Sequence, residues 1–496
     1  MYLEWNKFRK RAIKLIWICV LIFLLSSLVP STRAGTESKF DSSKVDAYIE
    51  QAMDRLGIPG ASVGIVRGKT VLYTKGYGTA GPGQGPVTPQ TPFVLGSTSK
   101  SVTAMAVMQL VDKKEIELNA PVQRYLPWFR LADETASAKI TVRHLLEQTS
   151  GLSTYEGQVT LVSDDIPLQD FIRKMKDVPL AAPVGFKYQY CNLNYAILGG
   201  VVEAVSRQTF GDYVKEHIFK PLKMSHSTAY ASEARAYGLA SGYQSVFGMV
   251  VPTFRKDRVA GVPDGSLISS AEDMTHYLIA QMNGGRYKER SVLPPDRVRE
   301  MHQPYAYTGD QAYYGMGWGI TDKRVEHSGS TENTSSYLTM EGEYGIVLLL
   351  NSADSIVSYD EVPLGVLKLL KGQEPNVEDL PSMKRTHLRI VLFLILVVIT
   401  TILPLKWMFG RKRNIDQEET VDKARNRWRT YAVKAGIAIV YLVIPVAVLI
   451  GFPKLMTPWS VAFAFQPGIS HFMVIYSFIL LSIGVLNIVL WVRKKS

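Results

Sequence analysis

The hydrophobic pattern divides the chain into a mixed central region and strongly apolar ends. One apolar run covers residues 15–25, and three more, each close to 20 residues long, follow residue 387. A helix needs about 20 apolar residues to cross a bilayer. The pattern therefore predicts an N-terminal leader or anchor and three C-terminal membrane helices, with a globular region between them.

Within the central region the spacing of apolar positions changes twice. Residues 45–56 have helical spacing, and the stretches 61–66 and 71–77 around Arg67-Gly68-Lys69 predict a β-hairpin. From about 120 to 285 the pattern is mostly helical with long loops. Strands return at 318–321, 335–340 and 345–350, and a helix closes the region at 362–370. We therefore predict an α/β (α+β) domain in which an antiparallel sheet, built from both ends of the domain, is flanked by helices and carries an inserted all-α region.

These patterns set the predicted boundaries. The leader, a signal peptide or signal anchor, covers 1–34, and the globular domain covers 35–380. The later segments are a membrane helix at 388–409, a basic cytoplasmic loop at 410–431, a second membrane helix at 432–452, an outer loop at 453–470, a third membrane helix at 471–492 and a cytoplasmic tail at 493–496.

The charges beside the apolar runs predict the orientation in a membrane. The 410–431 loop contains seven Lys and Arg residues, whereas Lys454 is the one charged residue between the second and third runs. Basic loops stay on the cytoplasmic side. The globular domain is therefore expected outside the cell. The basic residues before the first apolar run predict the same, whether the leader is cleaved after Ala34 or kept as an anchor.

Composition excludes several functional classes. The net charge of +12 comes from the ends, because residues 1–34 carry +5 and the chain from Lys384 onward carries +12, which leaves −5 for the middle. The basic surplus therefore belongs to membrane flanks and does not indicate nucleic acid. Cys19 and Cys191 lie far apart, and the eight histidines form no ligand pattern, so neither a disulfide framework nor a metal or other cofactor is expected.

The candidate chemistry begins with Ser97 and Lys100, the only Ser-x-x-Lys in the sequence. The apolar stretch 101–110 follows and predicts a buried helix. Residues three apart share a helix face, so the hydroxyl and the amine become neighbours. A serine needs a base to attack a carbonyl, and lysine can serve when burial lowers its pKa. Taken alone, the pair also fits a serine cap beside a solvated lysine.

Two more motifs occur once each: Tyr190-Cys191-Asn192 and His327-Ser328-Gly329. A phenol beside a lysine can be held as phenolate or relay protons. The Asn192 amide can accept from Lys100 while donating to a substrate carbonyl. Gly329 on an edge strand lets a ligand approach the backbone, whose N–H groups then face a developing oxyanion. Taken singly, these motifs also fit a polar loop and a solvated strand end.

Together and in this order, the motifs resemble those of the serine β-lactamase and penicillin-binding-protein superfamily, most closely its class C-like serine hydrolases. The resemblance covers about residues 40–375 and includes the stretches 143–152, 265–274 and 315–319. The three C-terminal spans and Asn333-Thr334-Ser335-Ser336 resemble a narrower branch, which includes the staphylococcal FmtA-like protein and membrane-bound peptidases that mature prodrugs. The resemblance implies a β-lactamase-like fold.

The resemblance also implies an acyl-enzyme mechanism. Ser97 would attack an amide or ester carbonyl, Lys100 and Tyr190 would share the general-base work, and Tyr190 would protonate the leaving group. The backbone N–H groups of Ser97 and Ser330 would hold the oxyanion, and water would release the acyl group. The expected supporting residues are Asn192, His327, Gly329, Ser330 and, as a substrate contact, Asn333.

His327 departs from the family pattern, because β-lactamases and many carboxypeptidases have lysine there. Lysine is a fixed cation for a substrate carboxylate, whereas histidine is only partly charged near neutral pH. We therefore expect a membrane-anchored peptidase or esterase of peptides containing D-residues, such as peptidoglycan-like peptides, rather than an efficient β-lactamase. Two alternatives stay open: a prodrug-activating N-acyl-D-amino-acid peptidase or esterase, and a non-catalytic receptor for wall fragments or β-lactams. No oligomeric state is predicted.

Overall fold

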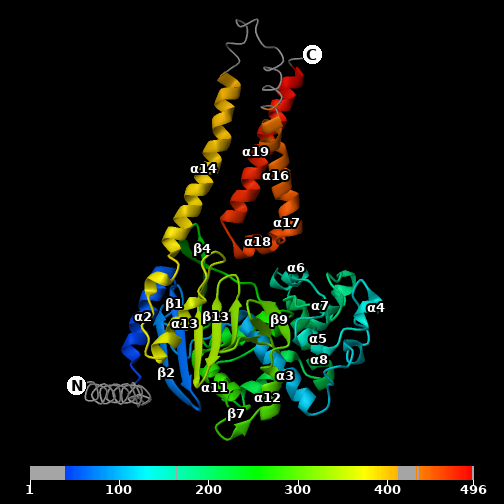
Figure 1. Cartoon of the computed structure of the whole chain (residues 1–496), viewed down its shortest axis with the longest axis vertical. Coiled ribbons are helices and arrows are strands. Elements are labelled where there is room, and N and C mark those ends of the chain that lie inside the picture. The colour runs from blue at the N-terminus through cyan, green and yellow to red at the C-terminus, as the bar shows by residue number, and fades with distance from the viewer. Residues whose placement is uncertain (1–39, 163–164, 411–431, 433–434, 494–496) are drawn as a thin grey trace, which may run out of the picture. The chain divides into compact units, whose positions relative to one another are not determined.

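The computed structural model describes residues 40–162, 165–410, 432 and 435–493 (Figure 1). The predicted leader lies outside the described residues. Residues 411–431 of the predicted basic loop and 494–496 of the predicted tail also lie outside the described residues, as do residues 433–434 at the start of the second predicted membrane helix. Residues from Ser42 onward form one unit, to which the following description applies.

The described residues form one eight-stranded sheet and three smaller sheets, and all their strands are given next in chain order. They are β1 Gly60–Arg67, β2 Thr70–Gly78, β3 Phe93–Val94, β4 Gly242–Val246, β5 Met249–Thr253, β6 Ile268–Ser269, β7 Arg286–Tyr287, β8 Arg290–Ser291, β9 Ala306–Gly309, β10 Ala312–Tyr314, β11 Gly319–Ile320, β12 Val325–Ser330, β13 Ser335–Glu341, β14 Tyr344–Leu350 and β15 Ser352–Ala353. The main sheet is antiparallel, in the order β2-β1-β14-β13-β12-β11-β10-β9. Because β1 pairs with β14, from Ala61 opposite Leu350 to Arg67 opposite Tyr344, the prediction of one sheet from both ends of the domain is confirmed.

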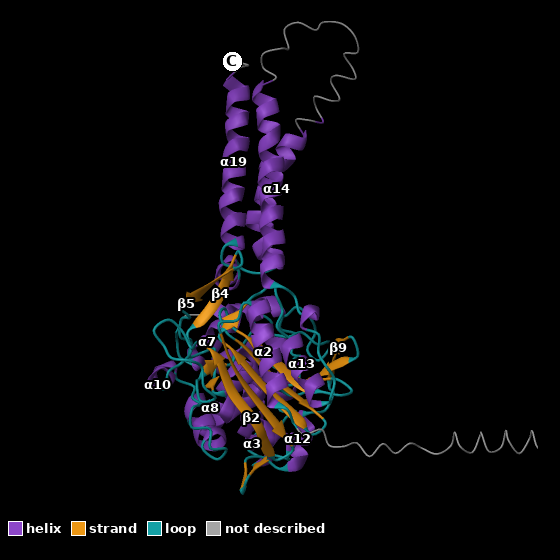
Figure 2. Ribbon diagram, turned by 90° about the vertical axis from the view of Figure 1, so that its left-hand side faces the viewer, coloured by secondary structure: helices purple, strands orange, loops and turns teal. Residues whose placement is uncertain are grey.

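The helices of the domain lie on both faces of this sheet and in the inserted region. They are α2 Ser42–Leu56, α3 Ser99–Asp112, α4 Glu134–Ser137, α5 Val142–Leu146, α6 Thr154–Gly157, α7 Leu168–Arg173, α8 Asn192–Ser206, α9 Phe210–Val214, α10 Ala231–Ala236, α11 Ala271–Met282, α12 Pro295–Met301 and α13 Glu361–Leu370. Helices α2 and α13 cover one face, beside β1 and β14, and α11 packs on the other (Figures 1 and 2). The contact with α11 is close, because a Cβ on Gly64 would lie 2.4 Å from the Thr275 side chain.

Helix α3 carries the predicted catalytic pair into the centre of the domain. Every residue from Ser99 to Val111 is buried, as expected for a helix that is apolar on all sides. It packs against α8 and α12 and against the turn Val262–Ser266. The start of α3 is thereby held between the sheet and the inserted helical region.

The hairpin β4–β5 is a correction to the prediction of a mostly helical region up to residue 285. Its strands pair from Gly242 with Thr253 to Val246 with Met249, and β15 adds alongside β4. Both strands are short and only partly buried, so their apolar alternation is weak. Their position is fixed instead by pairing with Ser352 and Ala353, more than 100 residues further along the chain.

Three helices of the described chain are long and apolar enough to cross a membrane, at Val377–Ile402, Ala435–Leu455 and Ile469–Val489. This finding confirms the prediction of three candidate membrane helices. The C-terminal elements are α14 Met383–Gly410, α16 Ile444–Val446, α17 Phe452–Leu455, α18 Trp459–Phe465 and α19 Ile469–Arg493. The short helix α17 ends the second apolar helix, and α18 lies in the connection between the second and the third.

Candidate active site

Lys100 lies at the centre of the predicted site. It occupies the first turn of α3, directly after the tight turn Gly96–Thr98, and is fully buried. Its Nζ lies 3.0 Å from Ser97 Oγ, 2.8 Å from Asn192 Oδ1 and 2.6 Å from the Asp264 carbonyl oxygen. The structure therefore brings the residues of the first two motifs into one hydrogen-bonded group.

The three contacts fit a protonated lysine that donates to Ser97 Oγ, and they also fit the neutral amine. Burial lowers the pKa of Lys100, although the negative charge of Asp264 opposes the shift. A neutral amine has two N–H donors and one lone pair. Asn192 Oδ1 and the Asp264 carbonyl can accept the two N–H bonds, which leaves the lone pair directed at the Ser97 hydroxyl. Lys100 can therefore accept the Ser97 proton.

Tyr190 and Asn192 reach this group from the start of α8. Gln148 Oε1 accepts from the Cys191 N–H at 3.0 Å and from Asn194 Nδ2 at 2.5 Å, which fixes the loop before the helix. The Ser97 side chain acts on the Tyr190 phenol and lowers its pKa, and the Tyr190 ring lies 4.8 Å from Lys100 Nζ. Burial raises the pKa of Tyr190. The phenol is therefore neutral. Of the two roles considered for Tyr190, this favours the proton relay over the phenolate.

Gly96 and Gly329 allow the third motif to approach the Ser97 turn. Gly96 has a φ of +58°, and a Cβ there would lie 2.6 Å from the Ser330 nitrogen. A Cβ on Gly329 would lie 2.2 Å from the Leu95 oxygen and 2.8 Å from the Ser97 nitrogen. The backbones of Ser97 and Ser330 are thus side by side, as a pair of N–H donors to one oxyanion requires.

His327 is a neutral imidazole in this structure. Its Nδ1 lies 2.6 Å from the Ser328 carbonyl oxygen, which can only accept, so the proton is on Nδ1. Its Nε2 lies 3.2 Å from the Tyr314 hydroxyl and accepts from it. Burial, together with the nearby Lys100 charge, lowers the pKa of His327 to about 4. His327 therefore offers no cation to a substrate carboxylate near neutral pH.

Asn333 requires a correction. It was expected to contact substrate, but its side chain is buried and its Nδ2 donates to Thr253 O at 3.0 Å. A Cβ on Gly242 would overlap its amide group. The polar group of Asn333 is therefore committed to fixing hairpin β4–β5 beside the end of β12, and we assign it a structural role.

Asp264 and Tyr314 are site residues that the sequence reasoning missed. The Asp264 carbonyl accepts from Lys100, and its buried carboxyl group, whose pKa is raised by burial, faces the same lysine. Tyr314 orients His327. Neither belongs to a short motif, although Asp264 directly precedes the 265–274 stretch quoted for the resemblance. The position of Asp264 next to that stretch was the one sequence feature that could have indicated its place in the site.

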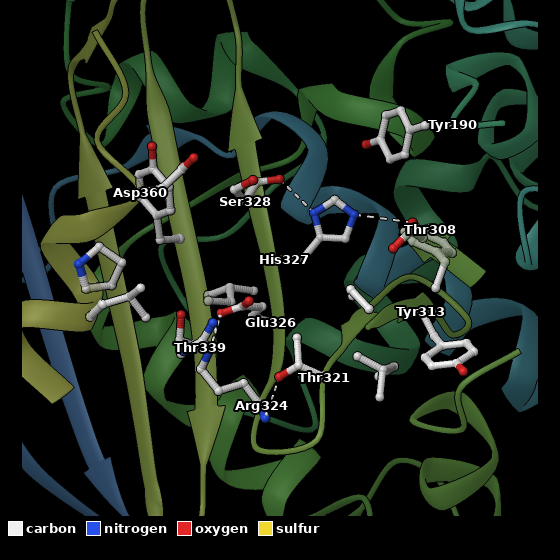
Figure 3. A pocket seen from close by; sticks show the side chains of 18 of the residues that line it. Tyr190, Thr308, Tyr313, Thr321, Arg324, Glu326, His327, Ser328, Thr339 and Asp360 are labelled. Atoms are coloured by element: carbon white, nitrogen blue, oxygen red, sulfur yellow. Dashed lines mark hydrogen bonds and ion pairs between the residues drawn. The ribbon is translucent and has the colours of Figure 1, made fainter. Parts of the chain in front are cut away.

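A cavity of about 420 Å³ opens beside Tyr190 and His327 and extends over the outer strands of the sheet (Figure 3). Arg324 and Glu326 line it and pair with each other at 3.0 Å. Among the described residues, no group of His, Cys, Asp or Glu side chains could hold a metal ion. The cavity thus has Tyr190 and His327 of the candidate site in its lining, and its charged side chains are Arg324, Glu326 and Asp360.

Comparison with known proteins agrees with this geometry. The family described as Beta-lactamase matches residues 45–371, about two thirds of the chain. The chain belongs to the Beta-lactamase family. Members of this family have the β-lactamase-like fold observed here and are serine hydrolases, so the predicted superfamily and fold are confirmed.

Individual relatives extend this result. Protein flp of Staphylococcus aureus (strain MW2) is 25% identical over 426 residues, which cover 82% of this chain and 83% of that protein. Unguisins hydrolase ungD' of Aspergillus campestris is 34% identical over 47% of this chain and 45% of its own. The octameric penicillin-binding protein homologue from Pyrococcus abyssi has a TM-score of 0.58 and 27% identity over 68% of this chain and 78% of its own. The predicted kinship with the FmtA-like staphylococcal branch is therefore confirmed.

Proposed function

We propose that this protein is a membrane-anchored serine hydrolase whose Ser97 forms an acyl-enzyme with amide or ester substrates. The observation that carries the proposal is the fully buried Lys100 amine, 3.0 Å from Ser97 Oγ. Burial of the Lys100 cation is costly, and the negative charge of Asp264, whose hydrogen bond to Lys100 runs through its backbone carbonyl, only partly offsets that cost. A general base gains a usable pKa from the same burial.

The catalytic cycle follows from the hydrogen bonds. The Ser97 oxygen bonds to the substrate carbonyl carbon while its proton moves to Lys100, and the Ser97 and Ser330 N–H groups stabilise the oxyanion. The bond to the leaving group then breaks, and the leaving group takes a proton from Tyr190. Lys100 returns its proton to Tyr190. A water molecule attacks the ester by the same steps and frees Ser97.

Charge in the cavity supports the substrate class. His327 is neutral, and Arg324 is paired with Glu326, so neither provides a free cation for a terminal carboxylate. We infer that peptides with D-residues, cleaved as a peptidase or esterase would, are better substrates than β-lactams. Substrates with a neutral group beyond the scissile bond are preferred. A prodrug-activating N-acyl-D-amino-acid peptidase or esterase is the second candidate, supported by the similarity to a protein named as a hydrolase of unguisins.

Location is part of the proposal. Three helices of sufficient length and the basic residues of the 410–431 loop support a multi-pass membrane protein with the domain outside the cell. A receptor without catalysis is the alternative from another class. It needs no lowered lysine pKa, and a cytoplasmic loop of about 20 residues leaves no room for a signalling domain.

The test is covalent labelling of the full-length protein with a fluorophosphonate, followed by peptide mapping. We expect the label on Ser97 and no label in Ser97→Ala. Tyr190→Phe should slow labelling by about 100-fold, the scale of a lost acid–base group. Tyr213→Phe is the matched control, because the buried Tyr213 hydroxyl has no hydrogen-bond partner among the described residues. Label on another residue, or normal labelling of Tyr190→Phe, would refute this mechanism.

A further inference from the structure

The connection between the second and third apolar helices contacts the hydrolase domain. Residues 453–465 of the predicted outer loop, called the outer loop from here on, include all of α18. The Tyr155 hydroxyl donates to the Pro453 carbonyl oxygen at 2.6 Å, and the Thr457 hydroxyl donates to Gln158 Oε1 at 2.5 Å. Gln244 Nε2 donates to the Ala464 carbonyl oxygen at 2.5 Å. The outer loop is therefore hydrogen-bonded to the domain at both its ends.

Two of these contacts fall on one short segment of the domain, α6 and the turn that follows it at Gln158–Val162. Helix α18 packs against this turn. Tyr155 lies in α6 and Gln158 begins the turn, so their polar groups face the outer loop. The opposite side of the same segment faces the catalytic group.

On that opposite side, Gly157 touches the second motif. A Cβ on Gly157 would lie 2.8 Å from the Asn192 nitrogen and 2.9 Å from Cys191 Sγ. Thr160, three residues further on, is buried; its hydroxyl donates to the Gly157 carbonyl oxygen at 3.0 Å, and its side chain acts on the Asp264 carboxyl group and lowers the pKa of that group. Both Asn192 and Asp264 bind Lys100 Nζ. The segment 154–162 therefore lies between the outer loop and the two residues that hold the catalytic amine.

We propose that Tyr155 and Gln158 are positioning residues through which the outer loop holds Asn192 and Asp264 in place around Lys100. The proposal rests on the function proposed above. Docking of the loop restrains segment 154–162, and loss of the docking lets Asn192 and Asp264 move relative to the amine. A small displacement of groups that orient a general base costs much rate, because proton transfer depends steeply on geometry. The membrane segment is then part of the catalytic apparatus as well as an anchor.

The test uses the full-length protein in detergent or lipid discs. Thr457→Val removes the loop's hydroxyl at nearly constant volume, and Thr457→Ser keeps it. We expect Thr457→Val to lower the limiting rate of fluorophosphonate labelling at Ser97 about 10-fold, with an unchanged half-saturating concentration and a changed pH profile. Thr457→Ser should label as the wild type does. A merely structural contact would lower the melting temperature and leave the limiting rate and the pH profile unchanged.

Further variants keep the outcome unambiguous. Tyr155→Phe breaks the second contact from the domain side and should reproduce the loss if Thr457→Val folds poorly. Tyr125→Phe is its matched control, because the Tyr125 hydroxyl accepts from the Glu117 N–H at 2.7 Å, away from both loop and site. Rates within twofold of wild type in both Thr457→Val and Tyr155→Phe would overturn this inference alone. A wild type without label on Ser97 would overturn the proposed function first.

Discussion

At the scale of single residues, the site depends on the pKa of one buried amine, that of Lys100, which two effects shift in opposite directions. Desolvation lowers the pKa of Lys100, and the negative charge of Asp264 raises it. Asp264 thus contributes in two ways, since its carbonyl accepts from the amine and its carboxyl group sets the charge around it. The two contributions can be separated, because substitution of the side chain leaves the carbonyl in place.

This balance predicts a pH effect. The labelling rate should rise with pH as Lys100 loses its proton, with a midpoint below the ordinary lysine value because burial lowers the pKa. Asp264→Asn removes the charge that opposes the shift, so the midpoint should move to lower pH. The rate of Ser97 labelling against pH measures it. Asp165→Asn is the control: Asp165 is exposed and its Oδ1 accepts from the Val259 N–H at 3.0 Å, which an amide can replace. A midpoint that stays or moves upward in Asp264→Asn would contradict the assignment.

The residue scale also shows what the sequence can and cannot predict. The spacing of Ser97 and Lys100 was sufficient, because both lie within one helical turn. Asn333 was misassigned because its environment is created by Gly242 and Thr253, 80 to 91 positions away, which no local pattern encodes. Asp264 was missed for the same reason, since a backbone carbonyl has no residue type. The proximity of Ser97 and Lys100 was predictable from local spacing, whereas the contacts of Asn333 and Asp264 with distant segments were not.

At the scale of elements, the site is formed where the turn before α3 meets the end of β12. Thr98 and Ser336 fix this junction through side-chain hydrogen bonds to each other and to the Leu95 carbonyl. The strand pattern predicted β13 and β14 closely but not hairpin β4–β5, because the two five-residue strands of the hairpin show no clear alternation of apolar and polar residues. The alignment of the proposed oxyanion donors, the N–H groups of Ser97 and Ser330, depends on how closely these two elements approach.

Gly329→Ala tests this approach. The new Cβ would lie 2.2 Å from the Leu95 oxygen, so β12 must move away from the Ser97 turn. Loss of alignment of one oxyanion donor costs about 100-fold in rate. We expect a comparable fall in the rate of Ser97 labelling, with a folded protein by circular dichroism. Gly85→Ala should label normally, because nothing lies within 4 Å of a Cβ there. Normal labelling of Gly329→Ala would show that the Ser330 N–H does not hold the oxyanion.

At the scale of the whole molecule, the first candidate membrane helix is joined to the domain by a buried polar contact. His387, in the first turns of α14, donates to Asp354 Oδ2, with 2.6 Å between the heavy atoms. Asp354 Oδ1 also accepts from the N–H groups of Ile356 and Val357 at 2.8 and 2.9 Å. Burial alone would raise the pKa of Asp354, but these hydrogen bonds hold it below its ordinary value. The carboxylate is therefore ionised in the folded protein.

Asp354→Asn should consequently lower the stability of the full-length protein. A buried hydrogen bond to a charged group is worth about 2 kcal/mol. Because the folded-state pKa of Asp354 is depressed, its contribution is present above the unfolded value of 3.8 and disappears as the pH falls through the folded value. The melting temperature of Asp354→Asn in detergent should therefore lie below that of the wild type at pH 7, and the difference should shrink below about pH 4.

Asp257→Asn provides the comparison for this anchor. Asp257 pairs with Arg235 at 2.5 Å, but the two side chains are 38% and 50% exposed, against 2% for Asp354. Exposed pairs contribute about 0.5 kcal/mol or less, because water screens them. If both variants shifted the melting temperature equally, the buried contact between Asp354 and His387 would not be what joins α14 to the domain. A larger, acid-sensitive shift in Asp354→Asn alone would mean that the hydrolase domain and its first membrane helix unfold together.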